Sequence, residues 1–264
     1  MKVNIVIPMA GRGQRFIDAG YSTPKPLIGI DGDLIIKKII DTMKLPNCQF
    51  IFIVRQDHCD GFNLDKKLLE IEPSAKIVKI NEITQGAICT VLLAKEYFND
   101  ENPVIIKDCD QIINWDPSHF MELVLRNNAE GAIVNIHTDS PNYSFSRINS
   151  KGHIIETAEK SLISNHGSVG IYYFAKGIDL IKYAERMIEK NLRVNNEFYT
   201  APVYNQLIQA GKKILHYPIA EMFQLGTPED LSENQNKVVR FFNSEFKNIL
   251  NKKESQGDEE IQEN

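Results

Sequence analysis

Short apolar segments typical of buried strands alternate with helix-like segments through the first half of this 264-residue chain, and that alternation limits the fold more than any other feature. Strand-like runs lie at 3–7, 49–54, 75–80 and 103–107, and segments with helical spacing lie at 34–43, 64–71, 86–98 and 117–126. This order predicts right-handed strand–helix–strand units and a parallel sheet. Ligands of such sheets bind outside the carboxyl ends of the strands, so we expect a site at the loops after Ile7, Ile80 and Lys107.

The second half has a different pattern, in which short strand-like segments follow one another directly. They lie at 131–137, 144–149, 153–157, 167–174 and 213–217, with a hairpin turn at 149–152 and helices at 178–189 and 201–210. Thr227 and Pro228 then open a helix that we expect to reach about residue 250, because Thr caps helix starts and Pro fits the first turn. The predicted fold class is α/β, a Rossmann-like mixed, mainly parallel sheet flanked by helices, with an inserted antiparallel subregion.

Composition excludes several classes of protein. Hydrophobic residues make up 42% and charged residues 25%, which is typical of a folded globular chain. The net charge of −5 argues against general nucleic-acid binding. No apolar run approaches the roughly 18 residues of a membrane span, and the first residues are typical of a strand rather than a signal peptide, so we expect a cytoplasmic protein. The cysteines and histidines show no CxxC or HExxH spacing, so neither disulfides nor zinc are expected.

A glycine-rich turn, Gly11 to Gly13, directly follows the first predicted strand. Glycines let successive backbone N–H groups point at an anion, and Arg15 adds a fork of donors for phosphate oxygens. The dinucleotide fingerprint of dehydrogenases requires a further glycine where Phe16 stands, which disfavours that class. The turn therefore predicts a phosphate site of another kind.

A lysine held between two prolines comes next, in Pro24-Lys25-Pro26-Leu27. Two prolines stiffen the backbone and limit where the ammonium of Lys25 can go. Alone, this lysine would be a solvated turn residue. Beside a phosphate-binding turn, it favours contact with an α-phosphate.

Together these residues resemble the signature of the sugar nucleotidyltransferases, also called nucleoside-diphosphate-sugar pyrophosphorylases: a first strand, then GxGxR, then PKxL. The resemblance covers about residues 1–235 and is greatest to small members of the capsule- or surface-polysaccharide type. It implies an enzyme that joins an NTP to a phosphorylated substrate, in the first place a sugar 1-phosphate, and releases pyrophosphate. It also implies Mg²⁺ as cofactor and Arg15, Lys25 and Lys160 as catalytic residues.

The resemblance assigns the remaining site residues one by one. The implied nucleotide-binding residues are Ala10, Gly11, Gly13, Arg15, Gln85 and Gly86, of which the last two would read the nucleobase. The implied metal ligand is Asp110, and the implied acceptor-binding residues are Glu159, Lys160, Gly170 and Glu197. Each also has an ordinary structural interpretation, such as a helix start for Gln85 or a surface ion pair for Glu159 and Lys160.

One departure from the family pattern concerns the metal. Many members carry an Asp just before the final Gly-Thr, where Gln224 lies at or next to that position here. An amide is a poorer ligand for Mg²⁺ than a carboxylate. We therefore expect Asp110, the triphosphate and water to hold the ion, or else Gln224 to face the core.

Three other functions stay open. Asp108-Cys109-Asp110 also matches the DxD of metal-dependent glycosyltransferases, which use a nucleotide sugar and have a similar sheet. A cytidylyltransferase acting on a non-sugar phosphate would share the early motifs. A catalytically inactive nucleotide-binding regulator is the third.

We expect one domain, residues 1–250, with a nucleotide-binding half at 1–128, an acceptor-binding half at 129–235 and a C-terminal helix at 228–250. Residues 251–264 are predicted to form a disordered acidic tail. The apolar stripe of the last helix would pack on the core or join subunits of a homo-oligomer. The expected partners are the NTP and the phosphorylated small molecule, without nucleic acid or membrane.

Overall fold

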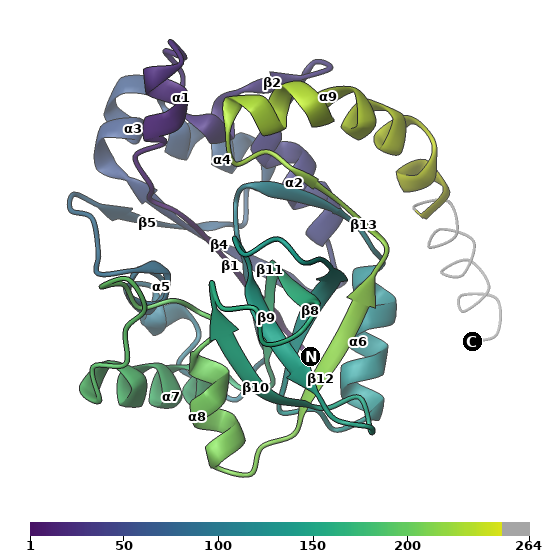
Figure 1. The fold of residues 1–264 in the computed structure, drawn as a ribbon. Helices are drawn as coiled ribbons and strands as arrows, with labels where there is room; N and C mark the ends of the chain where they lie inside the picture. The colour runs from purple at the N-terminus through teal and green to yellow at the C-terminus, as the bar shows by residue number, and fades with distance from the viewer. Residues whose placement is uncertain (250–264) are drawn as a thin grey trace, which may run out of the picture.

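The computed structural model describes residues 1–249, and its centre is a nine-stranded sheet (Figure 1). Along the main path the strand order is β10-β9-β11-β6-β1-β4-β5; β8 also pairs with β11, and β12 pairs with β8. The strands are β1 Val3–Met9, β4 Cys48–Arg55, β5 Lys76–Ile80, β6 Val104–Lys107, β8 Gly131–His137, β9 Ser144–Ile148, β10 Ile154–Glu159, β11 His166–Phe174 and β12 Ile214–Ile219.

The parallel half of the sheet is built on β1. This strand pairs in parallel with β4 and with β6, which places Ile5 between Phe50 and Ile105. All three side chains are fully buried. Strands buried on both faces form continuous apolar runs, which is why these segments could be predicted from the sequence.

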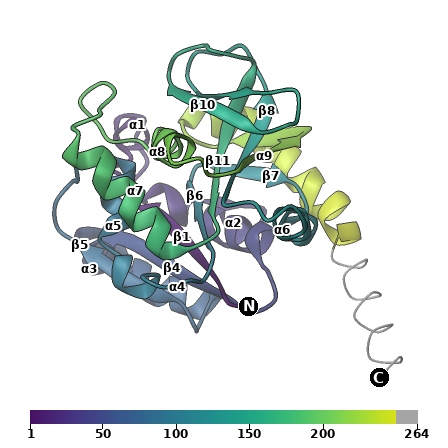
Figure 2. The same cartoon turned by 90° about the horizontal axis from the view of Figure 1, so that it is seen from below.

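Helices cover both faces of the sheet, as Figure 2 shows from below. One face packs against α2 Ile35–Met43, α4 Leu64–Ile71, α6 Pro117–Arg126 and α9 Pro228–Asn243. The other face packs against α5 Ala87–Leu92, α7 Gly177–Glu189 and α8 Val203–Gln209. The predicted mixed sheet with flanking helices is confirmed.

The antiparallel part begins at β11, which runs antiparallel to β6 and to β8. The hairpin of β9 and β10 lies beside it. A separate two-stranded ribbon pairs β7 Gln111–Asn114 with β13 Glu221–Gln224, and a small hairpin pairs β2 Gly29–Ile30 with β3 Asp33–Leu34. The β7–β13 ribbon was not predicted, and it brings the C-terminal segment to the end of β6.

Several predicted boundaries were wrong. The helix expected at 86–98 is interrupted: α5 ends at Leu92, and a 3₁₀ turn follows at Lys95–Tyr97. The short helices α1 Gln14–Asp18 and α3 Gln56–Phe62 were missed. The last helix, α9, ends at Asn243, a turn follows at Ser244 and helix resumes over residues 245–249, while Val238 and Phe241 pack into the core as expected.

The predicted tail, residues 251–264, lies outside the described residues. Within residues 1–249, no helix is both long and apolar enough to cross a membrane.

Candidate functional site

A cavity of about 790 Å³ opens at the end of β6 and β10, beside the middle of β11 and at one end of the β7–β13 ribbon. Charged side chains from distant parts of the sequence line it. The cations are Arg15 and Lys160, and the carboxylates are Asp108, Asp110, Glu159 and Asp230. A cavity with both signs of charge can bind a phosphorylated ligand together with a cation.

The glycine-rich turn leads from β1 into α1. Gly13 has a φ of 65°, which a residue with a side chain rarely adopts, and its carbonyl accepts the backbone N–H of Phe16. Phe16 is buried and anchors the turn, its ring centroid 5.2 Å from that of Tyr21. Arg15 reaches the cavity, whereas Ala10, Gly11 and Gly13 are not among the residues that line it.

Lys25 begins a 3₁₀ turn, Lys25–Leu27, and its Nζ lies 3.8 Å from Oδ2 of Asp110. The lysine side chain is only 14% exposed, so the turn does hold the ammonium in place as the flanking prolines suggested. Burial alone would lower the pKa of Lys25. The neighbouring Cys109, Asp110 and Asp108 outweigh that effect and raise the pKa, so this lysine stays charged at neutral pH.

Asp108 and Asp110 follow β6, as the sequence predicted. Burial, and then the charge of Asp110, raises the pKa of Asp108. Lys107 is fully buried beneath them and donates to the carbonyl of Asp108 (2.6 Å) and to Oε1 of Gln111 (3.0 Å), while its burial lowers its pKa. Asp110 is the more open of the two carboxylates, with 41% of its side chain exposed.

Gly170 lies in β11 with a φ of 68°. A Cβ at this position would be 2.6 Å from Oδ2 of Asp108 and 2.7 Å from Nε2 of Gln111. Gly170, which the resemblance assigns to the acceptor, lines the cavity. Its close neighbours also show a second reason for glycine, because the strand must pass directly against these two side chains.

Gln224 lines the cavity, so it does not face the core, and its Nε2 donates to the hydroxyl of Tyr143 (3.0 Å). A different carboxylate lies close to Asp110. A Cβ built on Gly226 would be 3.6 Å from Oδ2 of Asp110 and 3.6 Å from Oδ2 of Asp230. Asp230 was missed by the sequence analysis, although the Thr227 cap marks the start of its helix and accepts its backbone N–H (3.1 Å).

Glu159 and Lys160 both line the cavity at the end of β10. Glu159 is buried and accepts a hydrogen bond from the Ser144 hydroxyl. Lys160 has a φ of 50°, and its Nζ donates to the hydroxyl of Tyr199 (2.8 Å). That hydrogen bond is the main cause of the raised pKa of Lys160.

Gln85, Gly86 and Glu197 lie beside the cavity rather than among its lining residues. Ala87 and Tyr199, their neighbours in sequence, line it instead. The two segments touch, because the backbone N–H of Phe198 donates to the carbonyl of Gln85 (2.9 Å). The predicted nucleobase and acceptor segments are therefore adjacent.

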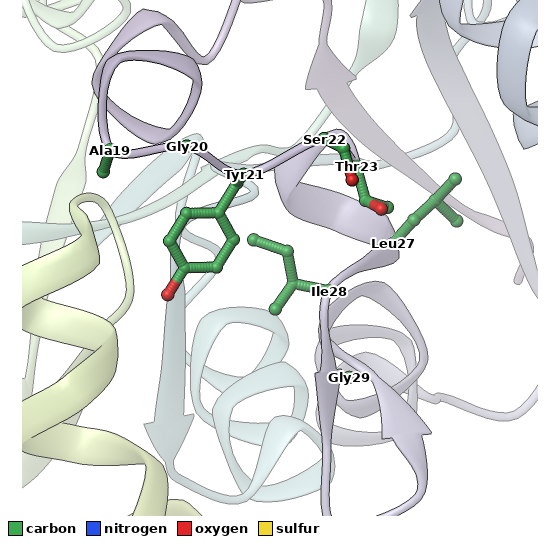
Figure 3. Close-up of a pocket in the computed structure, with 8 residues that line it drawn as sticks. All are labelled: Ala19, Gly20, Tyr21, Ser22, Thr23, Leu27, Ile28 and Gly29. Carbon is green, nitrogen blue, oxygen red and sulfur yellow. The ribbon is translucent and has the colours of Figure 1, made fainter.

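A second hollow lies next to the 3₁₀ turn at Lys25–Leu27 and contains no charged side chain (Figure 3). Its lining residues are Ala19, Gly20, Tyr21, Ser22, Thr23, Leu27, Ile28 and Gly29. Without a charged group this hollow offers little to a phosphate, so the charged cavity is the candidate site.

The residues at the cavity fit Mg²⁺ better than a metal that needs a full protein cage. Among residues 1–249, no group of three or more His, Cys, Asp or Glu side chains is arranged to enclose a metal. Mg²⁺ typically takes one or two carboxylates, with water and substrate phosphates completing its shell. The open carboxylate of Asp110 suits such a site, and the carboxylate of Asp230 lines the same cavity.

Comparison with known proteins gives a consistent result. The family model described as Nucleotidyl transferase matches residues 5–240. The structure is similar to that of the nucleoside-diphosphate-sugar pyrophosphorylase from Vibrio cholerae RC9, with a TM-score of 0.76 and 25% identity over 88% of this chain and 99% of that one. Comparison with curated protein sequences gave no match.

Two further solved structures share the fold at lower identity. The inositol-1-phosphate CTP transferase from T. maritima has a TM-score of 0.69 and 14% identity, over 89% of this chain and 95% of that one. A UDP-glucose pyrophosphorylase complexed with UDP-glucose has a TM-score of 0.71 and 16% identity, over 91% and 99%.

Proposed function

Because the chain belongs to the nucleotidyl transferase family, we propose that it joins an NTP to a phosphorylated small molecule, in the first place a sugar 1-phosphate, and releases pyrophosphate. The observation that carries this proposal is the convergence of Arg15, the Lys25–Asp110 pair and Lys160 on one cavity region. These groups come from four separate motifs, and their charges suit two phosphorylated ligands.

In this reaction the acceptor phosphate oxygen attacks the α-phosphorus, and pyrophosphate leaves in line. The attacking oxygen is already an anion, so no residue is needed as a general base. Arg15 and Lys25 would neutralise charge around the α-phosphate, and Lys160 would hold the acceptor phosphate. Positioning and charge neutralisation are the main contributions in phosphoryl-type transfer.

Mg²⁺ would be held by Asp110, with Asp230 as the nearby second carboxylate in place of the family Asp that Gln224 replaces. The bound ion supplies neutralisation of the triphosphate charge. Lys25 stays charged beside Asp110, so the protein itself supplies one fixed cation at this point.

The acceptor side of the cavity has hydroxyl and amide groups as well as charges. Ser140, Asn142, Tyr143 and Ser144 line it together with Glu159. These groups can hydrogen-bond a ligand rich in hydroxyls, which favours a sugar phosphate used for capsule or other surface polysaccharides. A non-sugar phosphate with CTP is the second candidate, and it has some support from the fold shared with the inositol-1-phosphate CTP transferase.

We propose that the two halves of one domain bind different substrates. The nucleotide would bind mainly to residues 1–128 and the acceptor mainly to residues 129–235, as a cytoplasmic enzyme, alone or as a homo-oligomer. The short hydrogen-bonded contact between Gln85 and Phe198 supports a site in which both halves take part.

A release assay tests the proposal against the two rival functions. The purified protein is incubated with Mg²⁺, each of the four NTPs and a panel of phosphorylated sugars and small metabolites. We expect pyrophosphate only when both an NTP and an acceptor are present. Release of a nucleoside diphosphate from a nucleotide sugar would favour the glycosyltransferase, and binding without any release would favour the inactive regulator.

A further inference from the structure

The turn at Gln85 and Gly86 is locked to a segment more than a hundred residues later. The carbonyl of Phe198 accepts the backbone N–H of Ile88 (3.2 Å), and the N–H of Phe198 donates to Gln85. Gly86 has a φ of 136°, and a Cβ there would be only 2.4 Å from the carbonyl oxygen of Phe198. The two segments therefore behave as one packed unit.

The later segment is a tight hairpin. Val194 and Glu197 exchange both backbone hydrogen bonds (3.0 and 2.9 Å), and the two residues between them, Asn195 and Asn196, have φ of 48° and 64°. Positive φ at both central positions is the requirement of a type I′ turn, which Asn tolerates well. Such a turn places the preceding Arg193 directly across from Phe198.

Arg193 uses its whole guanidinium group in this hairpin. Its Nε donates to Oδ1 of Asn191 (2.6 Å), its Nη1 donates to the carbonyl of Asn196 (3.1 Å), and its Cζ lies 4.1 Å from the ring centroid of Phe198. Its Nη2 donates to Oε1 of Gln85 (2.5 Å). Within residues 1–249 no carboxylate forms an ion pair with Arg193. The oxygen of Gln85 therefore does not compete with a carboxylate for the guanidinium group.

This contact decides which end of the Gln85 amide is free. A glutamine amide has an accepting oxygen and a donating NH₂ group, and a flip exchanges them. A guanidinium group can only donate, so the atom facing Arg193 is the oxygen. Among residues 1–249 no protein group accepts a hydrogen bond from this NH₂ group, so it can donate to a ligand.

We propose that Arg193 is a specificity-determining positioning residue, which holds the oxygen of Gln85 so that its NH₂ group selects nucleobases with a keto oxygen over those with an amino group. The proposal rests on the proposed function and on the family resemblance, which implies that Gln85, beside the cavity, reads the nucleobase. At position 4 of pyrimidines and position 6 of purines, uracil and guanine carry an acceptor, whereas cytosine and adenine carry a donor. A donor placed against a donor leaves both groups unsatisfied.

The test is an equilibrium titration with UTP, CTP, GTP and ATP in Mg²⁺, without acceptor, so that nothing turns over. The wild-type protein is expected to bind UTP more tightly than CTP, and GTP more tightly than ATP. Arg193→Met keeps an apolar chain over Phe198 but no donor, and should lower each ratio roughly ten-fold toward unity. Gln85→Glu keeps an acceptor for Arg193 but has no NH₂ group, and should reverse the preference.

Arg126→Met, at the exposed end of α6, is the matched control and should leave both ratios unchanged. Thermal unfolding of each variant checks that it is folded. Wild-type preference for CTP and ATP, equal binding of all four, or unchanged ratios in a folded Arg193→Met protein would overturn the proposal. A higher acceptor KM with unchanged ratios would assign Arg193 to the acceptor instead. If no NTP binds at all, the proposed function itself fails.

Discussion

At the scale of single residues, the function depends on charges that the fold holds in place before any ligand arrives. Lys25 is nearly buried, its pKa is raised, and Asp110 lies 3.8 Å away. A preorganised charge of this kind stabilises a transition state without further reorganisation. The cations Arg15, Lys25 and Lys160 would otherwise repel one another. The carboxylates of the same region lower the electrostatic cost of bringing them together.

Lys25→Ala should lower kcat roughly 100-fold or more and change NTP affinity much less, because Lys25 would meet charge that develops at the α-phosphate during transfer. Steady-state kinetics beside a binding titration separates the two effects. Lys66→Ala, an exposed lysine of α4, is the control and should retain full activity. An unchanged kcat in Lys25→Ala would make this residue an ordinary turn lysine.

The proposed metal ligands give a second prediction at this scale. Asp110→Asn should nearly abolish activity at every Mg²⁺ concentration, whereas Asp230→Asn should raise the Mg²⁺ concentration needed and Gln224→Asp should be tolerated or lower it. The reason is that Mg²⁺ in such sites takes one or two carboxylates with the phosphates. Mn²⁺ binding in the presence of NTP measures the ion directly. An active Asp110→Asn protein would contradict the assignment.

At the scale of elements, close packing between strands sets the geometry of the site. Gly170 lets β11 run against Asp108 and Gln111, which follow β6. Gly152, in the β9–β10 hairpin turn, has a similar positive φ of 76° but nothing within 4 Å of its Cβ position. Substituting either glycine by alanine would strain the backbone, but only the substitution at Gly170 would also crowd neighbouring atoms. Comparing the two variants therefore separates the cost of overpacking from that of backbone strain.

Gly170→Ala should lower the free energy of unfolding by about 1–3 kcal/mol more than Gly152→Ala, the usual cost of overpacking. It should also reduce activity, because Asp108 must shift. Chemical denaturation of both variants measures the difference. If both variants lost the same free energy of unfolding, the side chains around Gly170 would be able to move aside without destabilising the fold, which would contradict this prediction.

A histidine pair on β11 and β12 makes stability depend on pH. His216 in β12 faces His166 in β11, with ring centroids 4.9 Å apart, and its Nδ1 lies 3.0 Å from Oδ1 of Asn135 in β8. Burial, and then the charge of His166, lowers the pKa of His216 from 6.5 to about 4. Between these values the unfolded chain binds more protons than the folded one.

The free energy of unfolding should therefore fall as pH drops from 6.5 to about 4. His216→Gln should flatten part of this dependence, while His153→Gln serves as the control. Urea denaturation across this range measures it. An identical slope in wild type and His216→Gln would exclude this histidine as a cause.

At the scale of the whole molecule, the sequence predicts the parallel half well because its strands are continuous apolar runs, such as that around Ile5. The Gly13, Lys25 and Asp110 motifs could be found because each depends on local spacing. Asp230 and Arg193 could not, since their neighbours come from distant segments: β13 pairs with β7, and the hairpin after Arg193 packs on Gln85. Gln85 was singled out from the sequence as a nucleobase residue, but its contact with Arg193 could not be predicted.

The most direct test of nucleotidyl transfer follows the phosphorus atoms. An NTP labelled at the α-phosphorus and the same NTP labelled at the γ-phosphorus are each incubated with the protein, Mg²⁺ and an acceptor that supports pyrophosphate release. We predict that the α-label enters the acceptor-linked product and the γ-label leaves only in pyrophosphate. Transfer of the γ-label to the acceptor, or its release as inorganic phosphate with the α-label left in a nucleoside diphosphate, would contradict the account.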